Sequence, residues 1–167
     1  VFLSCSSPLR IDKQRNEARP WVVPTPVGGE LVAASGNLEP GIYQVCFTHI
    51  DDAGREGGAS PAVPINVTSG GIQVLAPMLP GFYTSIYVCP PKSTVFRAVA
   101  VLANGSGGVY SILELEPGSM GREINTQFLE ALPPEVHQVS AWNGRLYGAQ
   151  YLDEVDQTVI WFSQPLG

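Results

Sequence analysis

The sequence is short of charge and has no long apolar run, and each shortage excludes a class of protein. Charged residues make up only 14% of the 167 residues while 44% are hydrophobic, the reverse of a disordered chain. The net charge is −6 and no window is rich in Lys or Arg, which argues against nucleic-acid binding and against docking on an anionic membrane. No apolar run approaches the roughly 20 residues that a transmembrane helix needs.

Cysteine is also scarce. Cys5, Cys46 and Cys89 are too few for a disulfide framework and lack metal-ligand spacing. We expect free, partly buried thiols of a reducing compartment. A Cys46–Cys89 disulfide stays open as an alternative, because both residues fall in expected strands. A lipid-bearing Cys5 is a weaker alternative, since no charged and long apolar segment precedes it. We expect Val1–Ser4 to be a strand of something upstream, in a chain that is part of a longer protein.

Glycine and proline are abundant, with 18 and 15 residues, and in a folded chain this favours short β elements. Residues 1–29 are expected to be a strand remnant and a proline-rich linker, and residues 30–118 a domain of seven strands separated by turn residues. Those strands are Glu30–Ala34, Gly41–Ile50, Ser60–Val67, Gly71–Ala76, Phe82–Cys89, Thr94–Leu102 and Gly108–Leu115. Turns about every 8–12 residues predict an all-β, Greek-key sandwich.

Residues 119–167 have a different pattern. Gly121–Ala131 is compatible with one or two helical turns. Three short strands are then expected, with an acidic loop at Tyr151–Gln157 before the last one. They are Val136–Ala141, Arg145–Gln150 and Thr158–Ser163. Such a small hairpin extension buries little core by itself, so we expect it to pack on the sandwich, on another domain or on a partner.

Side chains suited to catalysis or metal binding are sparse. His49 and His137 are the only histidines, and Gly-x-Ser-x-Gly elbows and phosphate loops are absent. Asp51, Asp52 and Glu56 do not meet the EF-hand spacing, so a solvated turn is favoured over a calcium site. We therefore expect no enzymatic activity, no metal and no cofactor.

Aromatic side chains outnumber the places that strand alternation puts inside. The surplus suits a protein–protein surface, where aromatic residues are enriched. The candidate interface residues are Trp21, Trp142, Tyr147, Trp161 and Phe162.

Several motifs occur in one order along residues 19–166. They are Trp21–Pro26 (WVVPTP), Leu38–Ser60 (LEPGIYQVCFTHIDDAGREGGAS), Ile86–Pro91 (IYVCPP) with Phe96, Asn143–Gly148 (NGRLYG) and Ile160–Pro165 (IWFSQP). Together they resemble the fibronectin-III-like segment, with flanking propeller-type blade segments, of virion proteins from tailed bacteriophages and prophages. Cys46, Cys89 and the acidic Tyr151–Gln157 depart from that pattern.

The resemblance implies a fibronectin-III or immunoglobulin-like sandwich in a non-enzymatic tail or head–tail connector protein. It also implies a virion location after assembly in the bacterial cytoplasm, with other virion proteins as partners in a symmetric assembly. Two alternatives remain. One is a module that binds a host-surface glycan or receptor, with Tyr151, Asp153 and Glu154 suited to sugar stacking. The other is an accessory domain of a secreted hydrolase.

Overall fold

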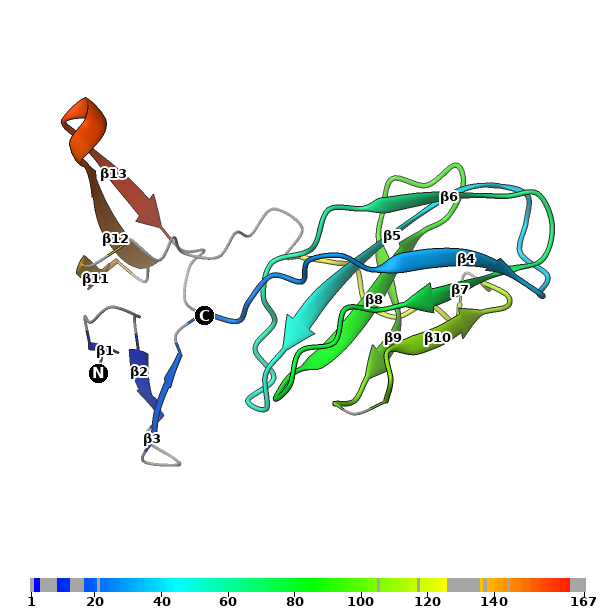
Figure 1. Cartoon of the computed structure of the whole chain (residues 1–167), viewed down its shortest axis with the longest axis horizontal. Helices are drawn as coiled ribbons and strands as arrows, with labels where there is room; N and C mark the ends of the chain where they lie inside the picture. The colour runs from blue at the N-terminus through cyan, green and yellow to red at the C-terminus, as the bar shows by residue number, and fades with distance from the viewer. Residues whose placement is uncertain are drawn as a thin grey trace. The chain divides into compact units, whose positions relative to one another are not determined.

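A computed structural model describes residues 2–3, 9–12, 17–20, 22–104, 106–116, 118–125, 136, 138–143 and 145–162. The chain divides into two compact units, Val23–Glu130 and Val1–Val22 together with Ala131–Gly167 (Figure 1). Within the described ranges every element is a strand except one short 3-10 helix. The expected all-β class is therefore confirmed. None of the helical segments in these ranges has the length and hydropathy to span a bilayer.

The Val23–Glu130 unit is a sandwich of two antiparallel sheets. One sheet has the order β10-β7-β4 and the other β6-β5-β8-β9. The seven strands are β4 (Glu30–Ala34), β5 (Gly41–Ile50), β6 (Val63–Val67), β7 (Gly71–Leu75), β8 (Tyr83–Cys89), β9 (Arg97–Leu102) and β10 (Val109–Ile112). Each lies within the range that the sequence predicts for it.

The strand order differs from that of an immunoglobulin constant domain. Here the first, fourth and seventh strands of the unit form one sheet. In the constant domain the first strand shares its sheet with the second, fourth and fifth. The difference depends on counting β4 as the first strand: counted as the second, its pairing with β7 corresponds to the B–E pair of that fold, and β5–β8 and β8–β9 correspond to C–F and F–G. The structure thus establishes a β-sandwich, and membership of the immunoglobulin or fibronectin-III family is not part of that finding.

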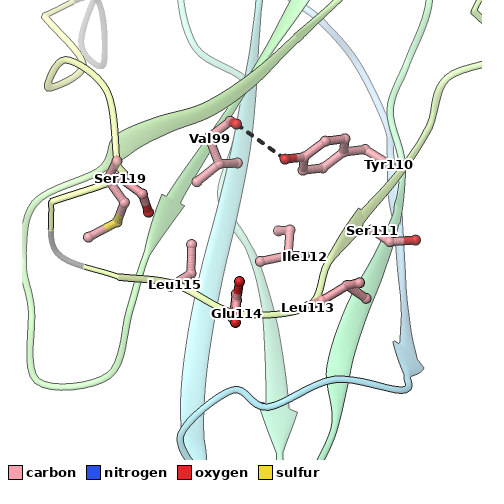
Figure 2. A pocket seen from close by; sticks show the side chains of 9 residues that line it. Val99, Tyr110, Ser111, Ile112, Leu113, Glu114, Leu115 and Ser119 are labelled. Carbon is pink, nitrogen blue, oxygen red and sulfur yellow. Dashed lines mark hydrogen bonds between the residues drawn. The ribbon is translucent and has the colours of Figure 1, made fainter.

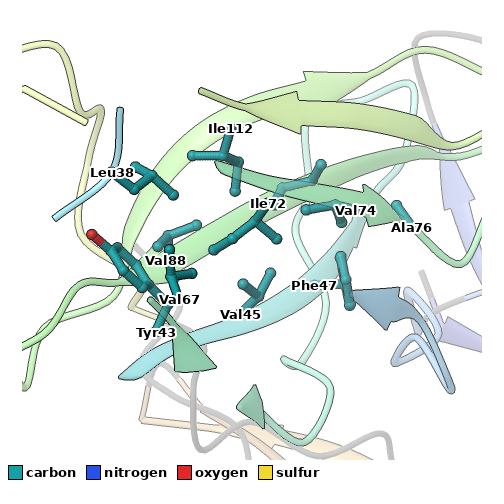
Figure 3. Packing of buried hydrophobic residues seen from close by; sticks show 11 residues of the cluster. Leu38, Tyr43, Val45, Phe47, Val67, Ile72, Val74, Ala76, Val88 and Ile112 are labelled. Atoms are coloured by element: carbon teal, nitrogen blue, oxygen red, sulfur yellow. The ribbon is translucent and has the colours of Figure 1, made fainter. Parts of the chain in front are cut away.

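The main core lies between the two sheets (Figure 3). Alternation along β5 points Tyr43, Val45 and Phe47 inward, where they meet residues of β7 and β8 such as Ile72 and Val88. Phe47 is fully buried. Its ring edge lies so close to Gly29 that a Cβ there would fall 2.4 Å from Cε2 of Phe47. Only glycine therefore fits at position 29, where the chain enters the sandwich.

The four-stranded sheet is also covered on its opposite face. There Cys46, Tyr87, Cys89 and Phe96 form a second buried cluster. Part of the cover is the segment 118–125, called the strap below, whose Ile124 packs on that cluster. The strap pairs with the edge of β9 through backbone hydrogen bonds from Gly121 N to Ala98 O (2.8 Å), Ala98 N to Arg122 O (2.9 Å) and Ile124 N to Phe96 O (3.0 Å).

The strap shows that the helical turns predicted from Gly121 onward are absent from its described residues. Gly121–Asn125 is extended and contains the isolated bridge between Glu123 and Arg97, where helical turns are predicted. The exposed edge of β9 offers unpaired N–H and C=O groups, and an extended segment satisfies them where a helix would not. The remainder of the predicted helical segment, residues 126–131, lies outside the described residues.

The other unit contains two three-stranded antiparallel sheets. One has the order β1-β2-β3 and the other β11-β12-β13. Their strands are β1 (Phe2–Leu3), β2 (Leu9–Asp12), β3 (Glu17–Pro20), β11 (Gln138–Trp142), β12 (Arg145–Leu152) and β13 (Gln157–Phe162). The three predicted C-terminal strands are present, and a 3-10 helix, η1 (Asp153–Val155), occupies the predicted acidic loop.

The N-terminal strands differ from two predictions, the proline-rich linker and the pairing of the first strand with something upstream. The predicted linker contains β2 and β3, and β1 pairs with β2 of the same chain, with Phe2 opposite Arg10. Leu9–Asp12 and Glu17–Pro20 are short and rich in charged residues. Leu9–Asp12 does alternate apolar and charged residues, but over only four positions, the shortest run that indicates a strand.

We expect Phe47→Ala to lower the free energy of unfolding by about 3–5 kcal/mol, because it removes a fully buried aromatic ring and leaves a cavity. Urea denaturation measures this loss. The control is Val32→Ala at an exposed position of β4, where a change within about 0.5 kcal/mol is expected. Equal effects of the two substitutions would contradict the placement of Phe47 in the core.

Candidate functional site

A buried carboxylate joins three segments of the sandwich. The side chain of Glu56 is only 6% exposed and forms an ion pair with Arg122 of the strap. Its Oε1 also accepts hydrogen bonds from Thr48 Oγ1 on β5 and from Tyr87 OH on β8, the latter at 2.7 Å. The carboxylate is therefore neutralised and hydrogen-bonded within the chain. This arrangement fastens the strap to the sheet and leaves Glu56 poorly placed to act as a catalytic base.

The carboxylate of Asp51 is also held by partners within the chain. Its Oδ1 accepts hydrogen bonds from the backbone N–H groups of Ala53 (3.0 Å) and Arg55 (2.8 Å), and its Oδ2 lies 2.6 Å from Arg55 Nη2. This is a closed turn held by a partly buried ion pair. Among the residues that the structure describes, no three His, Cys, Asp or Glu side chains are grouped to hold a metal ion.

His49 is buried beside β8. Its Nδ1 lies 3.2 Å from Thr84 Oγ1, and its ring centroid lies 5.9 Å from that of Phe82. Burial lowers the pKa of His49 below its ordinary value, so the ring stays neutral. Thr84 also approaches the carbonyl oxygen of Pro77 at 3.2 Å. The His49–Thr84 contact therefore gives two polar side chains of the interior a hydrogen-bond partner. His137 lies outside the described residues.

The two described thiols are free and buried, as the sequence predicts. Cys46 lies opposite Tyr87 and Cys89 opposite Gln44, so the cysteines are diagonal neighbours. Diagonal Cα atoms lie about 7–8 Å apart in an antiparallel pair, beyond the roughly 4.4–6.8 Å that suits a disulfide. Burial, with Cys89 and Glu56 nearby, raises the pKa of Cys46 to about 12. A protonated, enclosed thiol is a poor nucleophile.

A pocket of about 280 Å³ opens beside β9 and β10 (Figure 2). Its lining residues are Val99, Tyr110, Ser111, Ile112, Leu113, Glu114, Leu115, Ser119 and Met120. Tyr110 OH donates a hydrogen bond to Val99 O at 3.3 Å across the pocket. The lining offers no nucleophile with an adjacent base, and the volume is at the small end of the roughly 300–1,000 Å³ typical of ligand sites.

The C-terminal sheet exposes several large apolar side chains on one face. Register pairs Tyr147 with Phe162, Ala149 with Ile160 and Tyr151 with Thr158, so these residues share one face. Phe162 is 68% exposed, Tyr151 57% and Ile160 55%. The guanidinium of Arg145 lies over the ring of Phe162, 5.8 Å from its centroid. We call Arg145, Tyr147, Tyr151, Ile160 and Phe162 the aromatic face.

The predicted interface residues do not all belong to this face. Trp161 is half-buried on the opposite side of the sheet, where its Nε1 donates to Gln150 Oε1 at 3.2 Å. Trp142 pairs with Arg145 in the β11–β12 register, so it lies on the same side of the sheet as the aromatic face. Trp21 lies outside the described residues. Of the five candidates, Tyr147 and Phe162 belong to the aromatic face, and Trp142 lies on the same side of the sheet by register.

Sequence reasoning missed Ile160, Tyr151 and Arg145 as members of the surface. The alternation of Thr158, Ile160 and Phe162 along the last strand was visible in the sequence. The pairing of β13 with β12 was needed to bring Tyr147 and Tyr151 beside them.

No protein-family model, curated protein or solved structure matches the chain. The sequence patterns and the geometry described above therefore carry the functional argument.

Alkaline pH should destabilise the sandwich. Burial is the main cause that raises the pKa of Cys46 from 9.0, and that of Tyr87 from 10.0, to about 12 each. Stability from these neutral groups is complete below pH 9 and is lost as the pH rises through about 12, because the unfolded chain ionises first. Urea unfolding from pH 8 to 11 measures the loss. Cys46→Ala should make the decline shallower, and an unchanged slope would contradict the assignment.

Thiol labelling tests the role of the strap. In a Cys5→Ser background, Arg122→Ala should speed the reaction of Cys46 and Cys89 with a thiol reagent by about tenfold or more, because the strap loses its ion pair with buried Glu56. Arg145→Ala, in the other unit, is the control and should leave the rate unchanged. Equal rates for all three chains would show that the strap does not limit access.

Proposed function

We propose that the chain is a non-enzymatic structural protein of a tailed-bacteriophage virion, a tail or head–tail connector component that works through protein–protein contacts. The aromatic face is the observation that carries this proposal. It places Phe162, Ile160 and Tyr151 in solvent on a three-stranded sheet. Exposed apolar residues gathered on one face are typical of interaction sites.

The chemistry of the polar residues supports a role in contacts. Glu56 and Asp51 are held in internal ion pairs, His49 is buried and neutral, and the pKa of Cys46 is raised. These four groups serve the fold. The exposed aromatic side chains are the feature left to act on another molecule.

The family resemblance adds the virion context. The motif residues Asp51–Arg55 form a tight turn after β5, and Asn143 adopts a positive φ of 47° between β11 and β12. Both motif segments lie at turns of this chain. Assembly in the bacterial cytoplasm would agree with free thiols at Cys46 and Cys89.

A host-surface glycan-binding module is the second candidate. Tyr151 is exposed, and its hydroxyl donates to Asp156 Oδ1 at 2.5 Å beside the acidic η1. A fixed aromatic ring next to carboxylates suits stacking against a sugar with hydrogen bonds to its hydroxyl groups. Glycan-array binding that Tyr151→Ala abolishes would favour this candidate over the structural one.

Cryo-electron microscopy of purified particles tests the first candidate. The expected result is the chain in symmetric copies, with the C-terminal sheet against another virion protein. If mass spectrometry of the purified particles does not detect the chain, the proposal fails.

The double substitution Ile160→Ser/Phe162→Ser should reduce incorporation into particles by at least about tenfold, because exposed aromatic and aliphatic anchors carry much of the energy of such contacts. The matched control is Val32→Ser/Val109→Ser, which alters two similarly exposed apolar residues of the sandwich. Particle content is measured by quantitative mass spectrometry, and unfolding curves check that both variants fold. A loss confined to the control would place the contact on the sandwich.

A further inference from the structure

The aromatic face lies between unlike charges. Arg145 begins β12 and stacks on Phe162 at one end of the β12–β13 hairpin. At the other end η1 and the residue after it supply Asp153, Glu154 and Asp156 (Figure 1). A strand of eight residues spans about 26 Å. The face thus has a positive end, an apolar middle and a negative end.

Such a surface is complementary to a second copy of itself. A two-fold axis that lies in the plane of the contact and runs across the strands turns the partner's face toward this one and reverses its strand direction, so each positive end meets the other's negative end. Each chain carries a net charge of −6, so two copies repel one another overall. Close approach is therefore favoured where a local cation such as Arg145 faces the other copy's acidic turn.

The residue spacing places the axis. Arg145 and the acidic turn lie about equally far from the Ala149–Ile160 pair. An axis along that pair stacks β12 on β12 and β13 on β13, so Tyr147 of each copy lies against Tyr151 of the other, and Phe162 lies against Thr158. Ala149 is small and leaves room for the two Ile160 side chains at the centre. Tyr151, one of the two most exposed aromatic rings of the sheet, is then covered by Tyr147 of the other copy.

We propose that the aromatic face binds the aromatic face of a second copy of this chain, in an isologous two-fold contact centred on Ile160. The inference deepens the proposed function, on which it rests, by naming the partner. The three strands have five, eight and six residues and lie about 4.8 Å apart, so they cover roughly 300 Å² per copy, below the roughly 800 Å² per partner of a stable complex. The isolated pair is therefore weak, and many copies held in one particle strengthen it through effective concentration.

Disulfide trapping of the full chain detects a weak pair. In a Cys5→Ser background, Ile160→Cys places one thiol of each copy beside the axis, and mild oxidation with copper–phenanthroline should give a covalent dimer. Val32→Cys is the control, at a similarly exposed apolar position of the sandwich. Dimer yield from Ile160→Cys should exceed the control by at least about fivefold. Equal yields would indicate random collision and would overturn the proposal.

Charge reversal tests the two-fold arrangement. Arg145→Glu or Glu154→Arg, each added to Ile160→Cys, should lower the trapping rate by about tenfold, because like charges then meet at both ends of the contact. Combining both reversals in one chain should restore the rate. If the double reversal traps no faster than the single ones, the two-fold pairing is wrong.

The two proposals fail in different ways. Loss of particle incorporation in Ile160→Ser/Phe162→Ser, with no trapped dimer from Ile160→Cys, would keep the assembly role and overturn the self-pairing in favour of a different partner. A trapped dimer from a chain that is absent from particles would keep the self-pairing and overturn the virion assignment.

Discussion

The outer layer of the sandwich depends on one buried carboxylate. Glu56 accepts hydrogen bonds from β5 and β8 and an ion pair from the strap, so a single side chain holds three segments together. An unpaired charge in that position would be costly, and an apolar side chain would leave Thr48 and Tyr87 without their acceptor. Full satisfaction of this group is what allows Cys46 and Tyr87 to be buried on the same side of the sheet.

The clearest strand of the sandwich was readable from the sequence because two independent signals agree in it. Alternation places Tyr43, Val45 and Phe47 on one side of β5, and Gly or Asp residues bound the strand at both ends. The strap gave no such signal. Its position depends on Arg122 reaching Glu56, 66 residues earlier, and long-range ion pairs leave no local pattern.

The candidate surface was predictable only in part, for a similar reason. The sequence shows that Phe162 and Trp161 are both aromatic, but adjacent residues of a strand point to opposite faces. Trp161 therefore turns toward Gln150 while Phe162 stays in solvent. The β12–β13 register places Phe162, and not Trp161, on the same face as Tyr147. That register is set by the acidic turn at η1.

The distance along the chain between Glu56 and Arg122 has a consequence for biosynthesis. All seven strands of the sandwich leave the ribosome before the strap does, since β10 ends at Ile112. Until Arg122 and Ile124 emerge, the outer side of β5 and β8 lacks the part of its cover that the strap provides. In that interval the nascent chain has a nearly complete sandwich with two partly uncovered thiols, and a chaperone or a neighbouring nascent chain has its best opportunity to bind it.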